Sequence, residues 1–251
     1  MSSRCFARRG RGQVARNLTA IRGILFDKDG TLLDYAATWM PVNRNAALAA
    51  ARGDAGLAED LLRAGGYDPA TDRIASDAVL AAGTSLDIAE LWRTRVPGWG
   101  LGELTEMLDT MFLEQGRHTA VPVEALAPVL TRLKDRGLVL GIATNDSHAG
   151  IEATLGAFGV LGLFDFLAGY DSGHGMKPEP GMAHAFCDAC GLQAAEVAVV
   201  GDNLHDLAMG RAAQAGLVVG VLTGTGDREM LAGAADHVLE SIAGLEDLLA
   251  G

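Results

Sequence analysis

The sequence is poor in cysteine and has no long apolar run. Three cysteines among 251 residues cannot build a disulfide framework, so a reducing compartment is the default and we expect a cytoplasmic protein. No apolar stretch reaches the roughly 20 residues that a membrane-spanning helix needs, so we expect no association with a membrane. The hydrophobic fraction of 49% argues against a wholly disordered chain and indicates a globular protein.

Positive charge is also scarce, and this excludes a class of partners. Arg and Lys together number 20 against 32 acidic residues, which gives a formal net charge of −12. Such a surface repels the phosphate backbone of a nucleic acid, so we do not expect nucleic acid as a partner. The only lysines are Lys28, Lys134 and Lys177, so a lysine beside a candidate site is informative.

Residues 1–20 differ in composition from the rest of the chain. They contain no acid and five arginines, which are Arg4, Arg8, Arg9, Arg11 and Arg16. They also lack the apolar stretch of a secretory signal peptide. We interpret them as a flexible basic arm, and an organelle transit peptide is the alternative interpretation of the same composition.

Short apolar runs that alternate with helical segments predict the fold class. The runs are residues 21–27, 138–143, 197–200 and 217–221, and apolar positions at helical spacing occur in residues 123–136, 150–158 and 204–214. Nearly continuous apolar strands indicate burial on both faces, as in a parallel sheet. We therefore predict an α/β fold with a doubly wound, Rossmann-like parallel-sheet core over residues 21–34 and 123–251.

Residues 35–122 interrupt this alternation. They are rich in Ala, Leu and Arg and contain little strand signal, while residues 36–52 and 102–115 have a helical pattern. Gly and Pro separate the helical segments. We predict an all-α insert that connects the first strand of the core to the next core helix.

Polar residues follow the first apolar run, at the sheet edge where parallel sheets bind their ligands. Asp27 and Asp29 are two residues apart and are followed by Gly30 and Thr31. One carboxylate can attack phosphorus while the second carries the proton of the leaving oxygen, and Gly30 permits a tight turn. The alternative is an ordinary surface turn with local hydrogen bonds, which the buried strand before it disfavours.

Two further segments contain groups that can hold a phosphate. Thr144 and Asn145 follow the run 138–143, and a hydroxyl with neighbouring backbone N–H groups can bind a phosphoryl oxygen, although both residue types also cap helices. Lys177 lies in a Gly- and Pro-rich loop before a helical segment. Its charge can neutralise a phosphate, and an exposed surface lysine is the alternative.

The last segment, Gly201 to Asp206, adds acids to the same sheet edge. Asp202 follows the run 197–200 and would lie beside Asp27, where carboxylates this close require a cation. Oxygen ligands and phosphate chemistry point to Mg²⁺, and Asp206, one helical turn on, can orient a ligand or a metal-bound water. The alternative is a helix-capping Asp with a solvated partner.

The four segments occur in the order Asp-x-Asp-Gly-Thr, Thr-Asn, Lys-Pro and Gly-Asp-x-x-x-Asp. This order resembles the haloacid dehalogenase superfamily of phosphatases from about Arg22 to the C-terminus, and the C-terminal segment looks like that of phosphoglycolate-phosphatase-like members. The resemblance implies an aspartyl-phosphate on Asp27, with Asp29 as general acid and base. It also implies phosphate ligands (Thr144, Asn145, Lys177), Mg²⁺ ligands (Asp27, Asp202 and the backbone carbonyl of Asp29) and supporting residues (Gly30, Thr31, Gly201, Asn203, Asp206).

Two comparisons within the superfamily reduce the number of activities that we expect. The dehalogenases that give it its name lack a second Asp at the position of Asp29, because cleavage of a carbon–halogen bond needs no proton for the leaving group. Phosphonate hydrolases of the superfamily form a Schiff base with a lysine of the helical insert, and residues 35–122 contain no lysine. Both activities are therefore disfavoured.

The insert has the position of the type 1 helical cap of the superfamily. Such a cap would close over a small substrate and exclude water. Tyr35 and Trp39 lie close in sequence to the catalytic loop, and Arg44 can pair with a substrate carboxylate. These three residues are our candidates for substrate recognition.

One function and two alternatives follow from these observations. We expect Mg²⁺-dependent hydrolysis of phosphate monoesters of small metabolites through an aspartyl-phosphate, with 2-phosphoglycolate as one candidate substrate. A phosphomutase that acts on a sugar phosphate shares every core residue and would retain the phosphoryl group. A non-catalytic binding module on the same fold is the second alternative, which the intact Asp27 and Asp29 disfavour.

Overall fold

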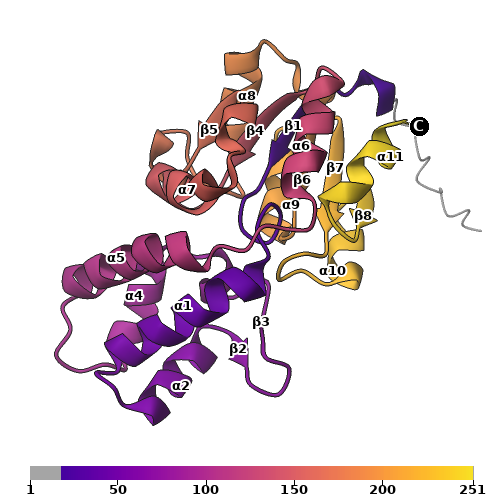
Figure 1. The fold of residues 1–251 in the computed structure, drawn as a ribbon. Helices are drawn as coiled ribbons and strands as arrows, with labels where there is room; N and C mark the ends of the chain where they lie inside the picture. The colour runs from indigo at the N-terminus through magenta and orange to yellow at the C-terminus, as the bar shows by residue number, and fades with distance from the viewer. Residues whose placement is uncertain (1–17, 251) are drawn as a thin grey trace, which may run out of the picture.

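The computed structural model describes residues 18–250, and a six-stranded parallel sheet lies at its centre (Figure 1). Its strands are β1 (Gly23–Phe26), β4 (Val139–Ala143), β5 (Phe166–Ala168), β6 (Val197–Gly201), β7 (Leu217–Val221) and β8 (His237–Leu239). They follow the order β5-β4-β1-β6-β7-β8, and each neighbouring pair is parallel. The predicted α/β core with a parallel sheet is confirmed.

The four central strands coincide with the four apolar runs of the sequence. Every residue of β1, β6 and β7 is buried, and so are four of the five residues of β4. The edge strands β5 and β8 have three residues each and are partly exposed. They leave no apolar run, and for this reason the sequence pattern did not predict them.

Helices cover both faces of the sheet. They are α6 (Leu126–Asp135), α7 (His148–Leu155), α8 (Gly181–Cys190), α9 (Leu204–Ala212), α10 (Arg228–Ala232) and α11 (Leu245–Ala250). Because successive strand residues point to opposite faces, Ile24 and Phe26 pack with α6, α7 and α11, whereas Leu25 packs with α8 and α9. Short 3₁₀ turns complete the core at Leu18–Ala20, Gly156–Phe158, Leu161–Leu163, Tyr170–Ser172, Ala194–Glu196 and Ile242–Gly244.

The insert between β1 and β4 is helical apart from one short hairpin. It contains α1 (Tyr35–Ala50), α2 (Ala55–Ala64), β2 (Tyr67–Asp68), β3 (Arg73–Ile74), α3 (Val79–Ala82), α4 (Ser85–Arg93) and α5 (Leu101–Thr119). The antiparallel pair of β2 and β3 departs from the expected all-α insert, because two residues per strand leave no strand pattern in a sequence.

The insert packs around a hydrophobic cluster of its own, which includes the fully buried Trp92. Figure 1 shows it below the sheet, with α5 beside α7 of the core. Small residues permit this approach, since a Cβ at Gly116 of α5 would lie 3.0 Å from Trp39 and 3.5 Å from Thr154 of α7. A separate cluster supports the proposed division into a core and a cap at residues 35 and 122.

Two expectations concern the ends of the chain and its membrane contacts. Residues 1–17 of the proposed arm lie outside the described residues, so the structure does not bear on them, and Leu18–Ala20 form a 3₁₀ turn. Of the helices in the described range, none is both long enough and apolar enough to cross a membrane.

Candidate functional site

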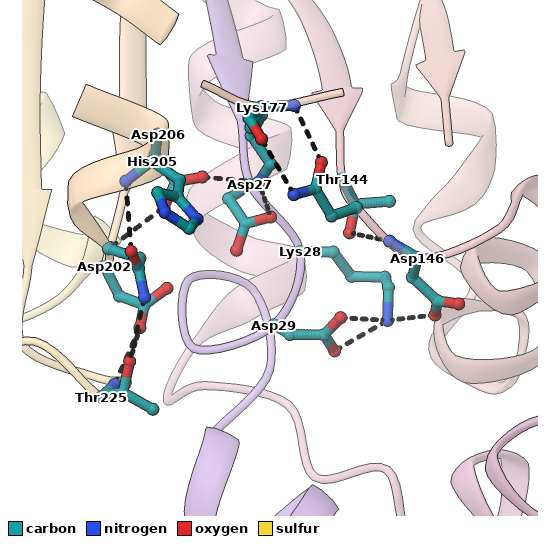
Figure 2. A network of polar contacts seen from close by, with 12 residues as sticks. Asp27, Lys28, Asp29, Thr144, Asp146, Lys177, Asp202, His205, Asp206 and Thr225 are labelled. Carbon is teal, nitrogen blue, oxygen red and sulfur yellow. Dashed lines mark hydrogen bonds and ion pairs between the residues drawn. The ribbon is translucent and has the colours of Figure 1, made fainter. Parts of the chain in front are cut away.

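The four predicted segments meet at the carboxyl ends of the central strands. Asp27 follows β1, Thr144 follows β4 and Asp202 follows β6, while Lys177 belongs to the loop before α8. All four residues line one cavity between the core and the insert. Figure 2 shows how closely their side chains gather.

Three buried carboxylates and one lysine form the centre of the site. Asp27, Asp202 and Asp206 each offer an oxygen within 4.8 Å of the oxygens of the other two. Lys177 Nζ lies 2.5 Å from Asp27 Oδ1 and 2.5 Å from Asp206 Oδ1 (Figure 2). When all four groups are ionised, three negative charges and one positive charge leave a net charge of −2.

Burial and mutual repulsion perturb these acids. Burial raises the pKa of Asp27 to about 6, an effect that Lys177 opposes and Asp206 reinforces. Burial also raises the pKa of Asp202 well above its ordinary value, and the charges of Asp206 and Asp27 add to this shift. Burial alone would lower the pKa of Lys177, but its two carboxylate partners more than offset this and raise it. A divalent cation would relieve the repulsion that remains.

Local backbone geometry lets the acids approach one another. Gly30 has a φ of +84°, and a Cβ there would lie 2.6 Å from the Asp202 carboxyl, so this turn requires glycine. Thr225, in the loop after β7, donates to Asp202 Oδ2 from its backbone N–H (2.8 Å) and from its hydroxyl (3.2 Å). Thr225 therefore orients a site residue, although no motif indicated it.

The start of α9 connects the acid cluster to the insert. Asn203 Oδ1 accepts from the His205 backbone N–H (3.1 Å), and Asp206 Oδ2 accepts from the Asn203 backbone N–H (3.0 Å). Asn203 Nδ2 donates to the backbone carbonyl of Ser76 in the insert. Asp206 thus caps the helix with one oxygen and binds Lys177 with the other. Gly201, the last residue of β6, precedes this cap.

The residues present fit a Mg²⁺ ion. The cluster of Asp27, Asp202 and Asp206 offers carboxylate oxygens alone, which are ligands of the kind that Mg²⁺ prefers. Its negative charge exceeds what Lys177 can neutralise. The Asp29 carboxylate is turned away toward Lys28 (Figure 2), which leaves the backbone carbonyl of Asp29 as the ligand that the family resemblance assigns.

The predicted phosphate ligands have different surroundings. Thr144 is buried, and its Oγ1 accepts from the Asp146 backbone N–H (3.1 Å). Asn145 does not point at the acids; its Oδ1 accepts from the Lys177 backbone N–H (2.9 Å) and its Nδ2 donates to the Lys177 carbonyl (3.3 Å). Asn145 therefore holds the loop that carries Lys177. Thr31 is buried, and its hydroxyl has no partner within residues 18–250.

A second charged group lies beneath Asp29. Lys28 is fully buried, and its Nζ lies 2.7 Å from both carboxylate oxygens of Asp29 and 3.0 Å from Asp146 Oδ2. Trp39 Nε1 of α1 also donates to Asp29 Oδ1 (2.7 Å). Burial raises the pKa of Asp29, and Lys28 opposes the shift. The partnership of Lys28 and Asp146 was not predicted, although the scarcity of lysine was a signal for it.

The three candidates for substrate recognition separate into two groups. Tyr35 and Trp39 line the cavity, and the Tyr35 hydroxyl donates to the Leu80 carbonyl (2.6 Å). Arg44 does not line it; its guanidinium pairs with Asp72 and lies 5.7 Å from the Tyr67 ring. Arg44 follows Trp39 by five residues of α1, which turns it to a different face of the helix.

Several polar residues of the cavity were not predicted. Asn43 is buried beside the cavity, and its Nδ2 has no hydrogen-bond partner in the described part of the chain. His205 Nδ1 is likewise buried without a partner there, and burial, together with Lys177, lowers the pKa of His205. Thr84 and Ser85 of the insert also line the cavity. Asn43, Thr84 and Ser85 belong to no short motif, whereas His205 lies inside the Gly201 to Asp206 segment.

Comparisons with known proteins agree with this arrangement. The profile of a family described as haloacid dehalogenase-like hydrolase matches residues 21–214. The chain is 28% identical over 202 residues to the phosphoglycolate phosphatase of Pectobacterium atrosepticum, which covers 78% of each chain. It is 27% identical over 195 residues to the N-acetylmuramic acid 6-phosphate phosphatase of Pseudomonas aeruginosa, which covers 76% of this chain and 77% of the relative.

The fold has close counterparts among solved structures. A predicted phosphoglycolate phosphatase from Haemophilus somnus superposes with a TM-score of 0.71 over 91% of this chain and 98% of its own, at 20% identity. At this identity the likeness shows the shared fold. The two relatives of nearly equal identity carry names with different substrates, so similarity alone does not select the substrate.

Proposed function

The chain belongs to the haloacid dehalogenase-like hydrolase family, and on that premise we propose that it hydrolyses phosphate monoesters of small metabolites through an aspartyl-phosphate on Asp27. It is a phosphatase, like its curated relatives. The observation that carries the proposal is the buried cluster in which Lys177 contacts Asp27 and Asp206 beside Asp202. A binding module would have no need to hold a carboxylate nucleophile at the floor of the cavity.

In the first step, a carboxylate oxygen of Asp27 attacks phosphorus, and the bond from phosphorus to the ester oxygen breaks. The leaving oxygen takes the proton of the Asp29 carboxyl and departs as an alcohol. Lys177 and the Thr144 hydroxyl would donate to the phosphoryl oxygens, and both line the cavity beside Asp27. The main contribution of these residues is to orient the ester and balance its charge.

In the second step, water replaces Asp27 on phosphorus. Asp29, now ionised, accepts a proton from the attacking water, and the bond from Asp27 to phosphorus breaks. Asp27 leaves as a carboxylate, inorganic phosphate is released, and Asp29 is protonated again for the next cycle. A Mg²⁺ ion held by Asp27, Asp202 and the Asp29 backbone carbonyl would supply charge for the phosphoryl oxygens.

The residues on the insert side of the cavity indicate which leaving alcohols the site can accept. In the described part of the insert, no arginine or histidine lines the cavity, so a substrate carboxylate would find no cation on that side. Asn43, Thr84 and Ser85 offer neutral hydrogen-bonding groups. We keep 2-phosphoglycolate as a candidate because of the relatives' names, and we place neutral hydroxylated esters beside it.

Phosphate release from a panel of esters tests this proposal. The panel contains 2-phosphoglycolate, glycerol phosphate, sugar phosphates and p-nitrophenyl phosphate, each with Mg²⁺. Release from one or more esters is expected, and acid quenching should trap protein heavier by one phosphoryl group on Asp27. An isomerised sugar phosphate without released phosphate would instead show a phosphomutase, and no turnover of any ester would revive a binding role.

The variant Asp27→Asn gives the matched control. It keeps the size of the side chain but removes the nucleophile, so we expect turnover to fall by at least about a thousandfold. Circular dichroism should show that the variant remains folded. Substantial residual turnover would reject the assignment of Asp27.

A further inference from the structure

Lys28 carries a charge that the reaction described above does not use. Its side chain is fully buried, and it does not line the cavity. A buried ammonium is costly unless carboxylates or other acceptors surround it. The cation that faces the reacting phosphate is Lys177, so Lys28 has to be understood through the groups that it contacts.

Those contacts converge on Asp29. Lys28 Nζ lies 2.7 Å from each Asp29 oxygen, and Asp146 Oδ2 holds the same Nζ at 3.0 Å from the far side (Figure 2). The ammonium also lies 5.2 Å from the centre of the Trp39 ring. Trp39 Nε1 in turn donates to Asp29 Oδ1 at 2.7 Å. The Asp29 carboxyl is therefore held by one residue of its own loop and by one residue of the insert.

This arrangement restricts the rotation of the Asp29 carboxyl. A carboxyl at the end of a single bond turns freely unless donors fix its plane. Lys28 contacts both oxygens, which sets the plane, and Trp39 engages one of them. Proton transfer to a leaving alcohol requires a carboxyl oxygen at hydrogen-bond distance and in a fixed direction.

We propose that Lys28 is a positioning residue that fixes the plane of the Asp29 carboxyl for proton transfer to the leaving alcohol, with Asp146 holding Lys28 and Trp39 supplying the second donor. The proposal rests on the proposed function, since it concerns Asp29 as an acid. In this proposal Trp39 holds the Asp29 carboxyl, whereas the sequence led us to expect that Trp39 contacts the substrate directly.

The dependence of kcat/KM on the leaving group distinguishes a positioning role of Lys28 from a merely structural one. An alkyl phosphate needs a proton on its leaving oxygen, whereas p-nitrophenolate leaves without one because it is weakly basic. The parameter kcat/KM covers the steps up to release of the alcohol. A residue that positions the acid therefore affects kcat/KM for alkyl esters, while general damage to the site affects both kinds of ester.

The experiment compares Lys28→Met with the wild type on two substrates, the panel's best alkyl phosphate and p-nitrophenyl phosphate. We expect kcat/KM to fall on the order of 100-fold for the alkyl ester and to stay within about threefold for the aryl ester. Trp39→Phe keeps the ring but removes the N–H donor, and it should show a smaller loss of the same selectivity. Lys134→Met removes a lysine from the core surface and should change neither value.

The variant Asp29→Asn separates failure of the inference from failure of the proposed function. If Asp29→Asn loses activity selectively on the alkyl ester but Lys28→Met loses equally on both esters or on neither, the positioning role is wrong and the mechanism stands. If Asp29→Asn shows no selectivity, the acid assignment itself is wrong. Should circular dichroism show that Lys28→Met does not fold, the same ratio measured for Trp39→Phe decides the question.

Discussion

The core side and the insert side of the cavity differ in charge and in how their polar groups are held. On the core side, Asp27, Asp206 and Lys177 are buried and bonded to one another. On the insert side, the cavity is lined by apolar side chains, by one acid, Asp109, and by neutral polar groups such as Asn43, whose Nδ2 is buried without a partner within the described chain. The core side is therefore organised before any substrate arrives, whereas the insert side offers groups that a substrate would have to satisfy.

This difference separates reaction from recognition. In the proposed reaction, the reacting groups require fixed distances, and ion pairs at the ends of rigid strands would provide them. The groups on the insert side would contact the leaving alcohol by hydrogen bonds and packing, which can vary without changing the reaction. The following predictions test whether the two sides behave independently.

Removal of the metal ion should lower turnover more than any other change. Because the ion would bind only to core residues, turnover of every ester should fall alike. EDTA is expected to lower turnover of every ester by at least about a thousandfold, because the acid cluster repels an anionic substrate without a divalent ion. Added Mg²⁺ should restore turnover. It should also raise the melting temperature of the wild type more than that of Asp202→Asn, and turnover that ignores EDTA would contradict the metal assignment.

The core side should also make stability depend on pH. Burial raises the pKa of Asp27 from 3.8 to about 6, so the folded protein binds this proton more tightly than the unfolded chain does. The resulting stabilisation is complete below pH 3.8 and is lost as the pH rises through about 6. In EDTA, the unfolding free energy of the wild type relative to Asp27→Asn should fall on the order of 3 kcal/mol across this window.

Urea denaturation at several pH values measures that difference. The reference variant Asp27→Asn lacks the titrating group, so the difference between the two proteins measures Asp27 together with the effect of its charge on Asp202 and Lys177. A difference between the two proteins that stays constant with pH would show that Asp27 does not titrate in this range.

On the insert side, Asn43→Leu should alter recognition and leave the reaction unchanged. Loss of one hydrogen bond to the substrate is expected to raise KM about tenfold for a hydroxylated ester, with kcat nearly constant. The stability of the free protein should change little, because the variant removes a buried Nδ2 that has no partner within residues 18–250. An equal fall of kcat for all esters would show that the two sides are coupled through Asn43.

Arg44→Ala should have the smallest effect. The guanidinium lies outside the cavity and pairs with Asp72 on the exposed hairpin side, where such pairs contribute about 0 to 1 kcal/mol. We expect kcat/KM to stay within about twofold of the wild type for carboxylated and neutral esters alike. A fall of kcat/KM for 2-phosphoglycolate alone would instead show that Arg44 contacts the substrate carboxylate.

The sequence predicted the central sheet and the location of the core motifs because both depend on neighbouring residues. Apolar runs mark buried strands, and the acids after them must lie at the shared sheet edge, as Asp27 and Asp202 do. The roles of these residues in the reaction remain predictions. Strands β5 and β8 were not predicted, because each has only three residues and is partly exposed, which is too short for a periodic pattern.

The contacts between distant segments could not be predicted in the same way. Lys28 and Asp146 come from different strand ends, and their pairing depends on the spacing of β1 and β4 in the folded sheet. Arg44 was proposed for its chemistry, but the direction of its side chain depends on how α1 packs against the hairpin. A single sequence shows which groups exist, while tertiary packing decides which of them meet.

The hydrogen bond between Trp39 and Asp29 should make the intrinsic fluorescence of the protein sensitive to the protonation of Asp29. Trp92 donates to the Leu61 carbonyl and Trp99 to the Ala50 carbonyl, so both indoles report on the interior of the insert. The indole of Trp39 instead contacts the Asp29 carboxyl, whose charge would change during each cycle of the proposed reaction. With Trp92 and Trp99 replaced by phenylalanine, the fluorescence of the remaining indole would follow turnover in real time without any added dye.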